Sequence, residues 1–566
     1  MEALIAFTQK IGSVQFPILM FLLKAFLVLF IIISIVIFIY DRYIQRENQL
    51  LINYPLLGRL RYIFYALRDP MRQYFGDEKF FDSFDKVKWV YNSAEGKSAY
   101  VSFSPSQPPI DKGLRIKNAN CVLNMENVSE RFSVEFGKQL KYPFVTSSIF
   151  GRSAMSDGAI SPEGTRAFAK GAYLGGFPIN TGEGGLTSNF LYTHKFKRDC
   201  KIYDTFEGSF FAKSVYRFMK LCTNGALAQK VYKHMVVDSK APDSFLFDKE
   251  ELVFYRVNWD VDLELFPSEV PDDIPDIIFQ MGSGLYGVRD QNGDFSEERY
   301  KKAMRFCRMT EIKIAQGAKQ TGGKLLAPKV SEEIAYYRGV KAHEDLFSPN
   351  QFPFAHTIEE LFVFAGRLKK LSEKPVGIKI VLSNKEGFEE YAALLKEKIE
   401  NSSEDYPDFI TIDGGYGGSG TAPLEMMMRV GMGIHEAIEI ADLTLKEYGV
   451  RDRVKLIASE KVLTPDDGAV LFALGADYVA IARAFMMSAG CIRARECSGA
   501  NGRACPVGLA TQDKKKRASF LVEKKAQNIA NYHAQLLHGL RSLLAIIGLD
   551  TLEKLDKSCL SFKDIK

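Results

Sequence analysis

The sequence predicts an α/β protein: a (β/α)₈ TIM barrel with an N-terminal transmembrane helix. Three observations lead to this prediction: eight short apolar runs, helical spacers between them, and turns or polar residues where the runs end. Alternating strands and helices indicate a parallel sheet, and eight such units fit a closed barrel. An open, doubly wound sheet is the alternative fold.

The composition narrows the class of protein further. The chain has 566 residues, 46% of them hydrophobic, which suits a globular protein with a large core. Its formal net charge of +5 is small for this length, so no nucleic-acid partner is expected. Eight cysteines are spread along the chain, unlike the dense spacing of a small disulfide scaffold.

The first element is an apolar run at Phe21–Tyr40 that contains one charge, Lys24. About 20 apolar residues suffice for a membrane-spanning helix. A cleaved signal peptide would have a shorter apolar core and a small-residue cleavage site. More basic residues follow the run than precede it, so the positive-inside rule predicts a single-pass membrane protein whose large C-terminal part is cytoplasmic. The basic residues that follow are Arg42, Arg46, Arg59 and Arg61.

The composition and the alternation of apolar runs with helical spacers divide the remaining chain into regions. After residues 1–42, which carry the transmembrane helix, we expect a helical extension at 43–140, the barrel at 141–512 and C-terminal helices at 513–566. A helical insertion at 186–275, rich in aromatic residues and lysine, is expected between barrel strands 2 and 3 and could be a lid, a docking surface or packing.

The eight predicted barrel strands are short apolar runs. In order they are FVTSSI, GGFPIN, DIIFQM, EIKIAQ, KPVGIKIV, DFITID, VKLIAS and DYVAIA. Active residues of such barrels lie at the C-terminal strand ends, and here those ends hold glycines, lysines and amides.

One strand end is a glycine-rich loop that begins at Asp413. Glycines let backbone N–H groups approach an anion, although a tight turn is the plainer interpretation. The turns "ASEK" and "IARAF" follow strands 7 and 8, where barrels of this kind bind phosphate. The loop's candidate residues are Asp413, Gly414, Gly415, Gly417 and Gly418.

Basic residues mark two further strand ends. Lys379 lies inside an apolar strand, where it could stabilise an anionic reduced flavin or reach solvent. Lys313 and Lys319 bracket "IKIAQGAK", and Arg338 follows. Three cations near one strand end suit a dicarboxylate, whereas each one alone would more often be a solvated surface charge.

Three cysteines close the barrel region. Cys491, Cys497 and Cys505 have the spacing C-x₅-C-x₇-C and precede Pro506. Zinc normally takes four ligands in close pairs, which are lacking. Three thiolates followed by proline suit a cuboidal iron–sulfur cluster, but spacing alone favours inert thiols.

Five motifs in order resemble the FMN-binding synthase domain of glutamate synthase. They are "AMSDGAISPEGTRAFAKGAYLGGFPINTGEGG", "KIAQGAK", "KPVGIKIV", "DFITIDGGYGGSGTAP" and "GC…C…CPVGLATQ", between about Pro143 and Gln512. The resemblance implies a barrel that holds FMN and a [3Fe–4S] cluster, binds 2-oxoglutarate and reduces 2-iminoglutarate to L-glutamate.

The resemblance also implies a role for each matching residue. Near the flavin it places Ala154, Met155, Ser156, Gln280 and Lys379, and around its phosphate it places Gly417, Gly418, Ser459 and Arg483. Glu183, Lys313, Lys319 and Arg338 would surround 2-oxoglutarate, and Cys491, Cys497 and Cys505 would hold the cluster.

Three local departures from the family pattern bear on these roles. The loop "KQTGGKL" is one residue shorter and carries Lys324 where a polar amide is common. The turn "ASEK" places Glu460 near the expected phosphate. The last cysteine spacing is x₇ where the family has x₄.

The sequence shows neither the N-terminal cysteine nucleophile of a glutaminase domain nor a second dinucleotide motif. We therefore expect electrons from an external donor, ferredoxin-like or a reductase subunit, and nitrogen from ammonia or a separate glutaminase. Two alternatives remain: an FMN enzyme acting on a different keto or hydroxy acid, and a membrane-tethered redox or partner subunit with little turnover.

Overall fold

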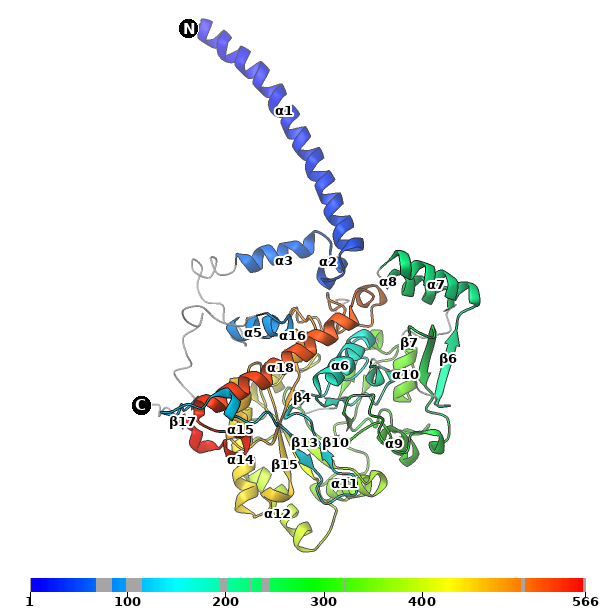
Figure 1. Cartoon of the computed structure of the whole chain (residues 1–566), viewed down its shortest axis with the longest axis vertical. Coiled ribbons are helices and arrows are strands. Elements are labelled where there is room, and N and C mark those ends of the chain that lie inside the picture. The colour runs from blue at the N-terminus through cyan, green and yellow to red at the C-terminus, as the bar shows by residue number, and fades with distance from the viewer. Residues whose placement is uncertain are drawn as a thin grey trace. The chain divides into compact units, whose positions relative to one another are not determined.

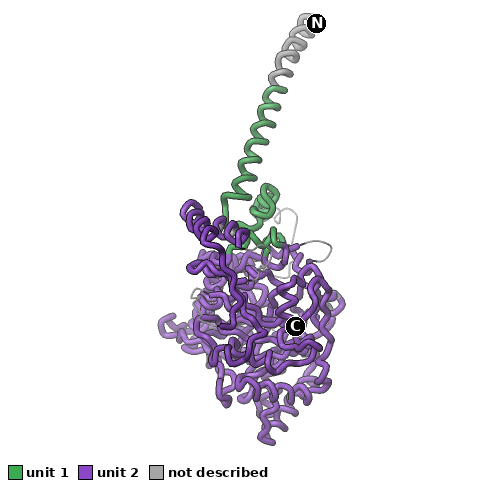
Figure 2. The backbone as a smooth tube through the Cα atoms, turned by 90° about the vertical axis from the view of Figure 1, so that its right-hand side faces the viewer, with its two compact units in different colours: residues 1–79, 506–508, 514–521 green, residues 80–505, 509–513, 522–566 purple. Residues whose placement is uncertain are grey.

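The computed structural model describes residues 2–67, 84–97, 114–193, 201–223, 226–236, 245–319, 322–499 and 504–562. The chain forms two compact units (Figure 2). The first consists of residues 1–79, 506–508 and 514–521, and the second of residues 80–505, 509–513 and 522–566.

The second unit contains a closed barrel of eight parallel strands, which confirms the predicted fold (Figure 1). The ring closes where β16 pairs with β4, with Val479 opposite Phe150. The barrel strands are β4 (Phe150–Arg152), β5 (Ile179–Asn180), β9 (Ile277–Met281), β10 (Met309–Lys313), β13 (Val376–Ile380), β14 (Phe409–Asp413), β15 (Lys455–Ser459) and β16 (Tyr478–Ile481).

The first barrel strand lies later than predicted. The run FVTSSI was expected to form it, but Phe144–Val145 is β3, which pairs antiparallel with β2 (Glu135–Phe136) outside the barrel. Phe136 packs edge-on against Phe409 at 5.4 Å and Tyr478 at 6.1 Å, at the N-terminal ends of their strands. The hairpin therefore closes the bottom of the barrel with aromatic side chains, which explains its apolar sequence.

Helices follow the barrel strands, and several begin with a side-chain cap. Ser161 accepts from Gly164 N at the start of α6, and Thr357 forms a capping box with Glu360 at the start of α11. These helices are α6 (Pro162–Gly175), α9 (Glu297–Met304), α10 (Glu332–Arg338), α11 (Ile358–Ser372), α12 (Lys385–Glu400), α13 (Leu424–Arg429), α14 (Ile434–Glu447), α15 (Pro465–Ala473) and α16 (Arg483–Ser488).

The C-terminal part of the second unit covers one side of the barrel. The long helix α18 (Val522–Ile547) packs against α6, α15 and α5 (Phe84–Ala94) (Figure 1). Beyond it, β17 (Leu560–Phe562) pairs antiparallel with β1 (Leu114–Ile116). The chain leaving the barrel thus returns to the segment that enters it.

The segment between β5 and β9 contains strands as well as helices. The antiparallel strands β6 (Tyr203–Glu207), β8 (Val253–Val257) and β7 (Leu246–Asp248) form a sheet. The helices α7 (Phe210–Cys222) and α8 (Ala226–Val236) connect them. Tyr216, Tyr232, Phe247 and Phe254 are buried in the core of this insertion, which accounts for its aromatic composition.

The first unit begins with the 38-residue helix α1 (Glu2–Ile39). Within Met20–Ile44, an 18-residue window has a mean hydropathy of 3.1, and the stretch is long and apolar enough to cross a membrane. After the turn η1 (Tyr40–Ile44) come the short helix α2 (Gln49–Asn53) and α3 (Leu57–Ala66). The short helix α17 (Lys514–Arg517) belongs to this unit too.

Candidate active site

The C-terminal ends of the barrel strands bring the predicted site residues to one rim. Lys313 ends β10, Asp413 ends β14 and Ser459 ends β15, while Lys379 is the penultimate residue of β13. Gln280 lies near the end of β9, and Arg483 begins the helix after β16. The rim is therefore the candidate active site.

Lys379 is buried beside a carboxylate. Its Nζ lies 3.3 Å from Asp413 Oδ1, and only 5% of the residue is exposed. Burial disfavours the ammonium, but the charges of Asp413 and Glu311 outweigh it and raise the pKa of Lys379. Asp413 Oδ2 also accepts from Gly317 N at 2.8 Å, so this carboxylate joins the "QGAK" turn to the glycine-rich loop.

Glu311 is a buried carboxylate that the sequence analysis did not single out. Its Oε1 accepts from Gln280 Nε2 at 2.6 Å and from Asn180 Nδ2 at 2.8 Å, and its Oε2 accepts from the Thr411 hydroxyl. Glu311 stands two residues before Lys313 on β10, so both side chains face the same side of the strand. That spacing was the available signal, and the network fixes the amide of Gln280.

Three cations and Glu183 form a second electrostatic group. Lys313 Nζ lies 3.1 Å from Glu183 Oε2. Burial acts to raise the pKa of Glu183, but the charges of Lys313, Arg338 and Lys319 lower it below its ordinary value. Glu183 is thus held as a carboxylate among cations that outnumber it.

Keeping the cations of this group charged costs free energy, because they are buried close to one another. Burial lowers the pKa of Lys319, and the charge of Lys313 lowers it further. Burial also lowers the pKa of Arg338, whose Nη2 donates to Asp157 O at 3.1 Å. A bound dianion would relieve this cost by supplying the missing negative charge.

Glycines let the shortened loop approach Glu183. A Cβ on Gly323 would collide with the Glu183 carboxylate, and a Cβ on Gly282 would lie 2.7 Å from Glu183 Oε2. Lys324, the unusual residue of this loop, is exposed and lies 4.9 Å above the Phe347 ring. Gln320 and Thr321 lie outside the described residues.

The predicted phosphate cradle has an arginine beside its glycines. A Cβ on Gly418 would lie 3.3 Å from Arg483 Nη2, so the bare backbone and the guanidinium line the same space. Gly414 N donates to Ser459 O at 3.0 Å, which ties the loop to β15. Gly415 is held by a bond from its N–H to Met432 O at 2.7 Å.

Glu460 is used as a helix cap. Its Oε2 accepts from Ile434 N at 3.0 Å, at the start of α14, where the N-cap Gly433 provides no side chain. Burial raises the pKa of Glu460. The departure at "ASEK" therefore has a structural role beside the cradle.

Arg152 supports the turn at Ala154, Met155 and Ser156. This fully buried arginine donates to Met155 O at 3.1 Å and to Asn180 O at 2.8 Å, and its guanidinium lies 5.2 Å from the Phe168 ring. Burial lowers its pKa to about 9. Sequence reasoning missed Arg152 because nothing local marks its carbonyl partners.

The three cysteines form a separate group near the glycine-rich loop. Arg493 N donates to Cys491 Sγ at 3.4 Å, and a Cβ on Gly420 would lie 3.7 Å from Cys497 Cβ. Burial raises the pKa of Cys491 to about 12, and the other two thiols add to the shift. Lys329 Nζ donates to Cys497 O at 2.6 Å and to Ala159 O at 3.1 Å.

No three His, Cys, Asp or Glu side chains within the described ranges are grouped as ligands of one metal ion. A cuboidal cluster differs, because each cysteine binds a different iron atom. Burial and the neighbouring Cys505 raise the pKa of Cys497, and Cys497 and Cys505 both contribute to the raised pKa of Cys491, so the three side chains lie near one another. Residues 500–503, which contain the extra length of the x₇ spacing, lie outside the described residues.

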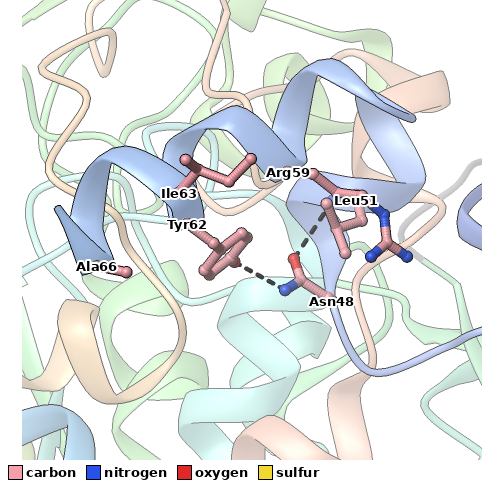
Figure 3. A pocket seen from close by; sticks show the side chains of 6 residues that line it. All are labelled: Asn48, Leu51, Arg59, Tyr62, Ile63 and Ala66. Atoms are coloured by element: carbon pink, nitrogen blue, oxygen red, sulfur yellow. Dashed lines mark hydrogen bonds between the residues drawn. The ribbon is translucent and has the colours of Figure 1, made fainter.

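A pocket in the first unit has a different character (Figure 3). Its lining is mostly apolar, and Asn48 Nδ2 donates to Tyr62 OH at 2.7 Å across it. Arg59, also in its lining, pairs with Asp41 at 2.6 Å. The lining residues are Asn48, Leu51, Arg59, Tyr62, Ile63 and Ala66.

Comparison with known proteins gives a family match. Residues 88–550 match the conserved region in glutamate synthase. The glutamate synthase large subunit-like protein YerD of Bacillus subtilis is 31% identical over 577 residues, which cover 94% of this chain and 93% of that protein. The archaeal glutamate synthase (NADPH) of Methanocaldococcus jannaschii is 33% identical over 282 residues, 49% of this chain and 51% of that protein.

Among solved structures, a flavocytochrome b2 variant with sulfite bound is similar with a TM-score of 0.41. It is 10% identical, and the match covers 91% of this chain and 90% of that chain. The barrel assignment rests on the strand pairing of this chain alone.

Proposed function

The chain belongs to the glutamate synthase family, and we propose that it forms L-glutamate from 2-oxoglutarate and ammonia on a flavin held in the barrel. Family membership makes it a glutamate synthase-like oxidoreductase. The observation that carries the proposal is the group of buried cations around Glu183, together with the Lys379–Asp413 pair on the same rim.

FMN is the cofactor that the family supports, and the residues present fit it. Arg483 beside Gly418 suits a phosphate, and the buried ammonium of Lys379 suits a ring that becomes anionic on reduction. Gln280, oriented by Glu311, would donate to or accept from the ring. FMN, when bound, would supply the two electrons that the reaction requires.

The substrate assignment follows from charge. Ammonia condenses with the keto group of 2-oxoglutarate and water leaves; two electrons and two protons then convert 2-iminoglutarate to L-glutamate. Lys313, Lys319 and Arg338 would hold the two carboxylates and orient the imine carbon. Arg338 Nε is buried without a hydrogen-bond partner among the described residues, as expected of a donor reserved for a ligand.

We also propose a [3Fe–4S] cluster on Cys491, Cys497 and Cys505, through which electrons from an external donor reach the flavin. The closeness of Gly420 to Cys497 supports a short path between the cysteines and the glycine-rich loop. A ferredoxin-like protein or a reductase subunit would be the donor, and a separate glutaminase could supply the ammonia.

We place the protein in a membrane as a single-pass protein with a cytoplasmic catalytic domain. The length and hydropathy of Met20–Ile44 support the span. The arginines after it support the orientation, which protease protection in sealed vesicles would test.

A spectroscopic titration tests the function. The purified chain loaded with FMN should bleach on reduction, 2-oxoglutarate should perturb its flavin band, and ammonia should then yield L-glutamate. No spectral change at saturating 2-oxoglutarate would contradict the substrate assignment.

The same assay with other keto and hydroxy acids tests the second candidate, a different acid substrate. The observation that favours this candidate is the contact of Gly323 with Glu183, because it places the shortened loop beside the residues proposed to bind the substrate. A preference for another acid would replace 2-oxoglutarate and leave the flavin assignment intact.

A further inference from the structure

Helix α7 carries an apolar face that points away from its own core. Ala212 and Tyr216 are buried in the insertion, yet four large apolar residues of the same helix are exposed. Their helical spacing places them along one side. They are Phe210 at 82% exposure, Phe211 at 69%, Phe218 at 68% and Leu221 at 87%.

The neighbouring helix also exposes apolar side chains. α8 packs against α7 (Figure 1). Its Leu227 and Met235 are 41% and 40% exposed. Single exposed apolar residues are common on soluble proteins, but a contiguous group marks a binding surface or a membrane contact. We call the six exposed residues of α7 and α8 the outer apolar face.

The charged side chains of the two helices themselves are all basic, apart from titratable His234. The two helices contain five lysines and arginines and no aspartate or glutamate. Lys213 pairs with Glu207 of β6, whereas Arg217 and Lys220 are exposed. Exposed phenylalanines bordered by cations are typical of helices that lie in the interface of an anionic bilayer.

We propose that the outer apolar face binds an anionic phospholipid bilayer and so docks the catalytic unit on the membrane. The basic border complements acidic lipid headgroups, and the phenylalanines would enter the boundary between headgroups and acyl chains. A symmetric contact with a second copy would bring the same cations together, which disfavours that occupant.

This step rests on the proposed membrane span of α1, which would lower the affinity that the contact needs. A unit tethered to a bilayer meets it at a high effective concentration, so a weak interfacial surface suffices for docking. The proposal does not depend on the enzyme's substrate, because no rim residue takes part in it.

Lipid quenching of an added tryptophan tests the proposal in the full chain. The sequence has two tryptophans, so Phe218→Trp adds one probe to a low background. In vesicles of brominated phosphatidylcholine with phosphatidylglycerol, we expect the added fluorescence to be quenched. Leu443→Trp is the matched control, because Leu443 is 49% exposed on α14, far from α7 in the second unit (Figure 1), and should not be quenched.

Charge reversal separates lipid binding from simple tethering. In the Phe218→Trp background, Arg217→Glu with Lys220→Glu should remove most of the quenching in vesicles with phosphatidylglycerol. Lys385→Glu with Lys396→Glu on α12 changes the net charge equally and should leave the quenching unchanged; these lysines are 46% and 50% exposed.

Three results would overturn the proposal. They are an unquenched Phe218→Trp in anionic vesicles, equal quenching of Phe218→Trp and Leu443→Trp, and shielding of Phe218→Trp that depends on protein concentration without lipid. The last would identify a second copy as the occupant. An unchanged circular dichroism spectrum of each variant shows that the comparison is made between folded proteins.

Discussion

The barrel rim and helix α7 use the same basic residue types in opposite surroundings. At the rim, Lys313 and Lys379 are 8% and 5% exposed, and each faces a carboxylate. On α7, Arg217 and Lys220 are exposed beside phenylalanines. Buried cations recognise a small ligand because they replace its water completely, whereas exposed cations suit an extended anionic surface.

The largest effect should come from breaking the buried pair at the rim. Lys379→Met leaves Asp413 and Glu311 without their cation. Removing one partner of a buried ion pair costs about 3–5 kcal/mol in the free energy of unfolding. Chemical denaturation should show this loss, and the variant should purify with little FMN.

A surface pair is the control for that change. Lys385 pairs with Glu447 at 3.0 Å, and both side chains are about half exposed, at 46% and 60%. Lys385→Met should therefore change the free energy of unfolding far less than Lys379→Met and leave the FMN content unchanged. Equal losses in the two variants would contradict the difference between rim and surface.

The second largest effect should come from removing a cation proposed to bind the substrate. Lys319→Met removes a charge-assisted contact worth about 1.5–3 kcal/mol, so the KM for 2-oxoglutarate should rise about 10- to 100-fold. Lys324→Met, a change at an exposed lysine in the same loop, should alter KM by less than about threefold. Steady-state kinetics of both variants check the assignment of Lys319.

The pH dependence of binding follows from the lowered pKa of Lys319. Only the protonated ammonium attracts a carboxylate, so affinity for 2-oxoglutarate should fall as pH rises through a pKa below the ordinary lysine value. Flavin titrations from neutral to alkaline pH should show this fall. In Lys319→Arg the fall should move to higher pH, and an unmoved profile would assign the titration to another group.

Replacing one of the three cysteines should remove the iron–sulfur cluster and leave the flavin bound. Cys497→Ser should abolish the electron paramagnetic resonance signal of an iron–sulfur cluster while the flavin absorption remains. Cys559→Ser, at a partly exposed thiol, should change neither. The absence of any cluster signal in the anaerobically purified parent chain would remove the cluster proposal.

The smallest effect is expected where only packing changes. In Gly323→Ala, the new methyl group must displace the Glu183 carboxylate. We expect this to weaken substrate binding by about 1 kcal/mol, which is roughly a fivefold rise in the KM for 2-oxoglutarate. Gly449→Ala is the control: Gly449 has a φ of +73° and an open Cβ position, so only backbone strain should appear, as lost stability.

Sequence reasoning located the barrel because apolar runs and polar strand ends are local features. It placed the first strand at FVTSSI, since apolarity alone cannot separate a barrel strand from the β2–β3 hairpin that closes the barrel. The hairpin is recognisable only when Phe136 is seen against Phe409 and Tyr478.

The site was predictable to the extent that its residues stand at strand ends. Lys379, Asp413 and the cations around Glu183 were predicted in this way. Glu311 and Arg152 were not, because their partners come from other strands or from backbone carbonyls and become neighbours only on closure of the ring. Likewise, the helix that Glu460 caps begins far from it in sequence.

The pairing of β1 with β17 has a consequence for biosynthesis. Leu114 pairs with Phe562, and Ile116 pairs with Leu560, so β1 finds its partner strand only after the whole barrel has been synthesised. The apolar N-terminal helix leaves the ribosome long before that. Any membrane insertion would therefore precede completion of the catalytic unit, and the nascent polypeptide would mature while already attached to its bilayer.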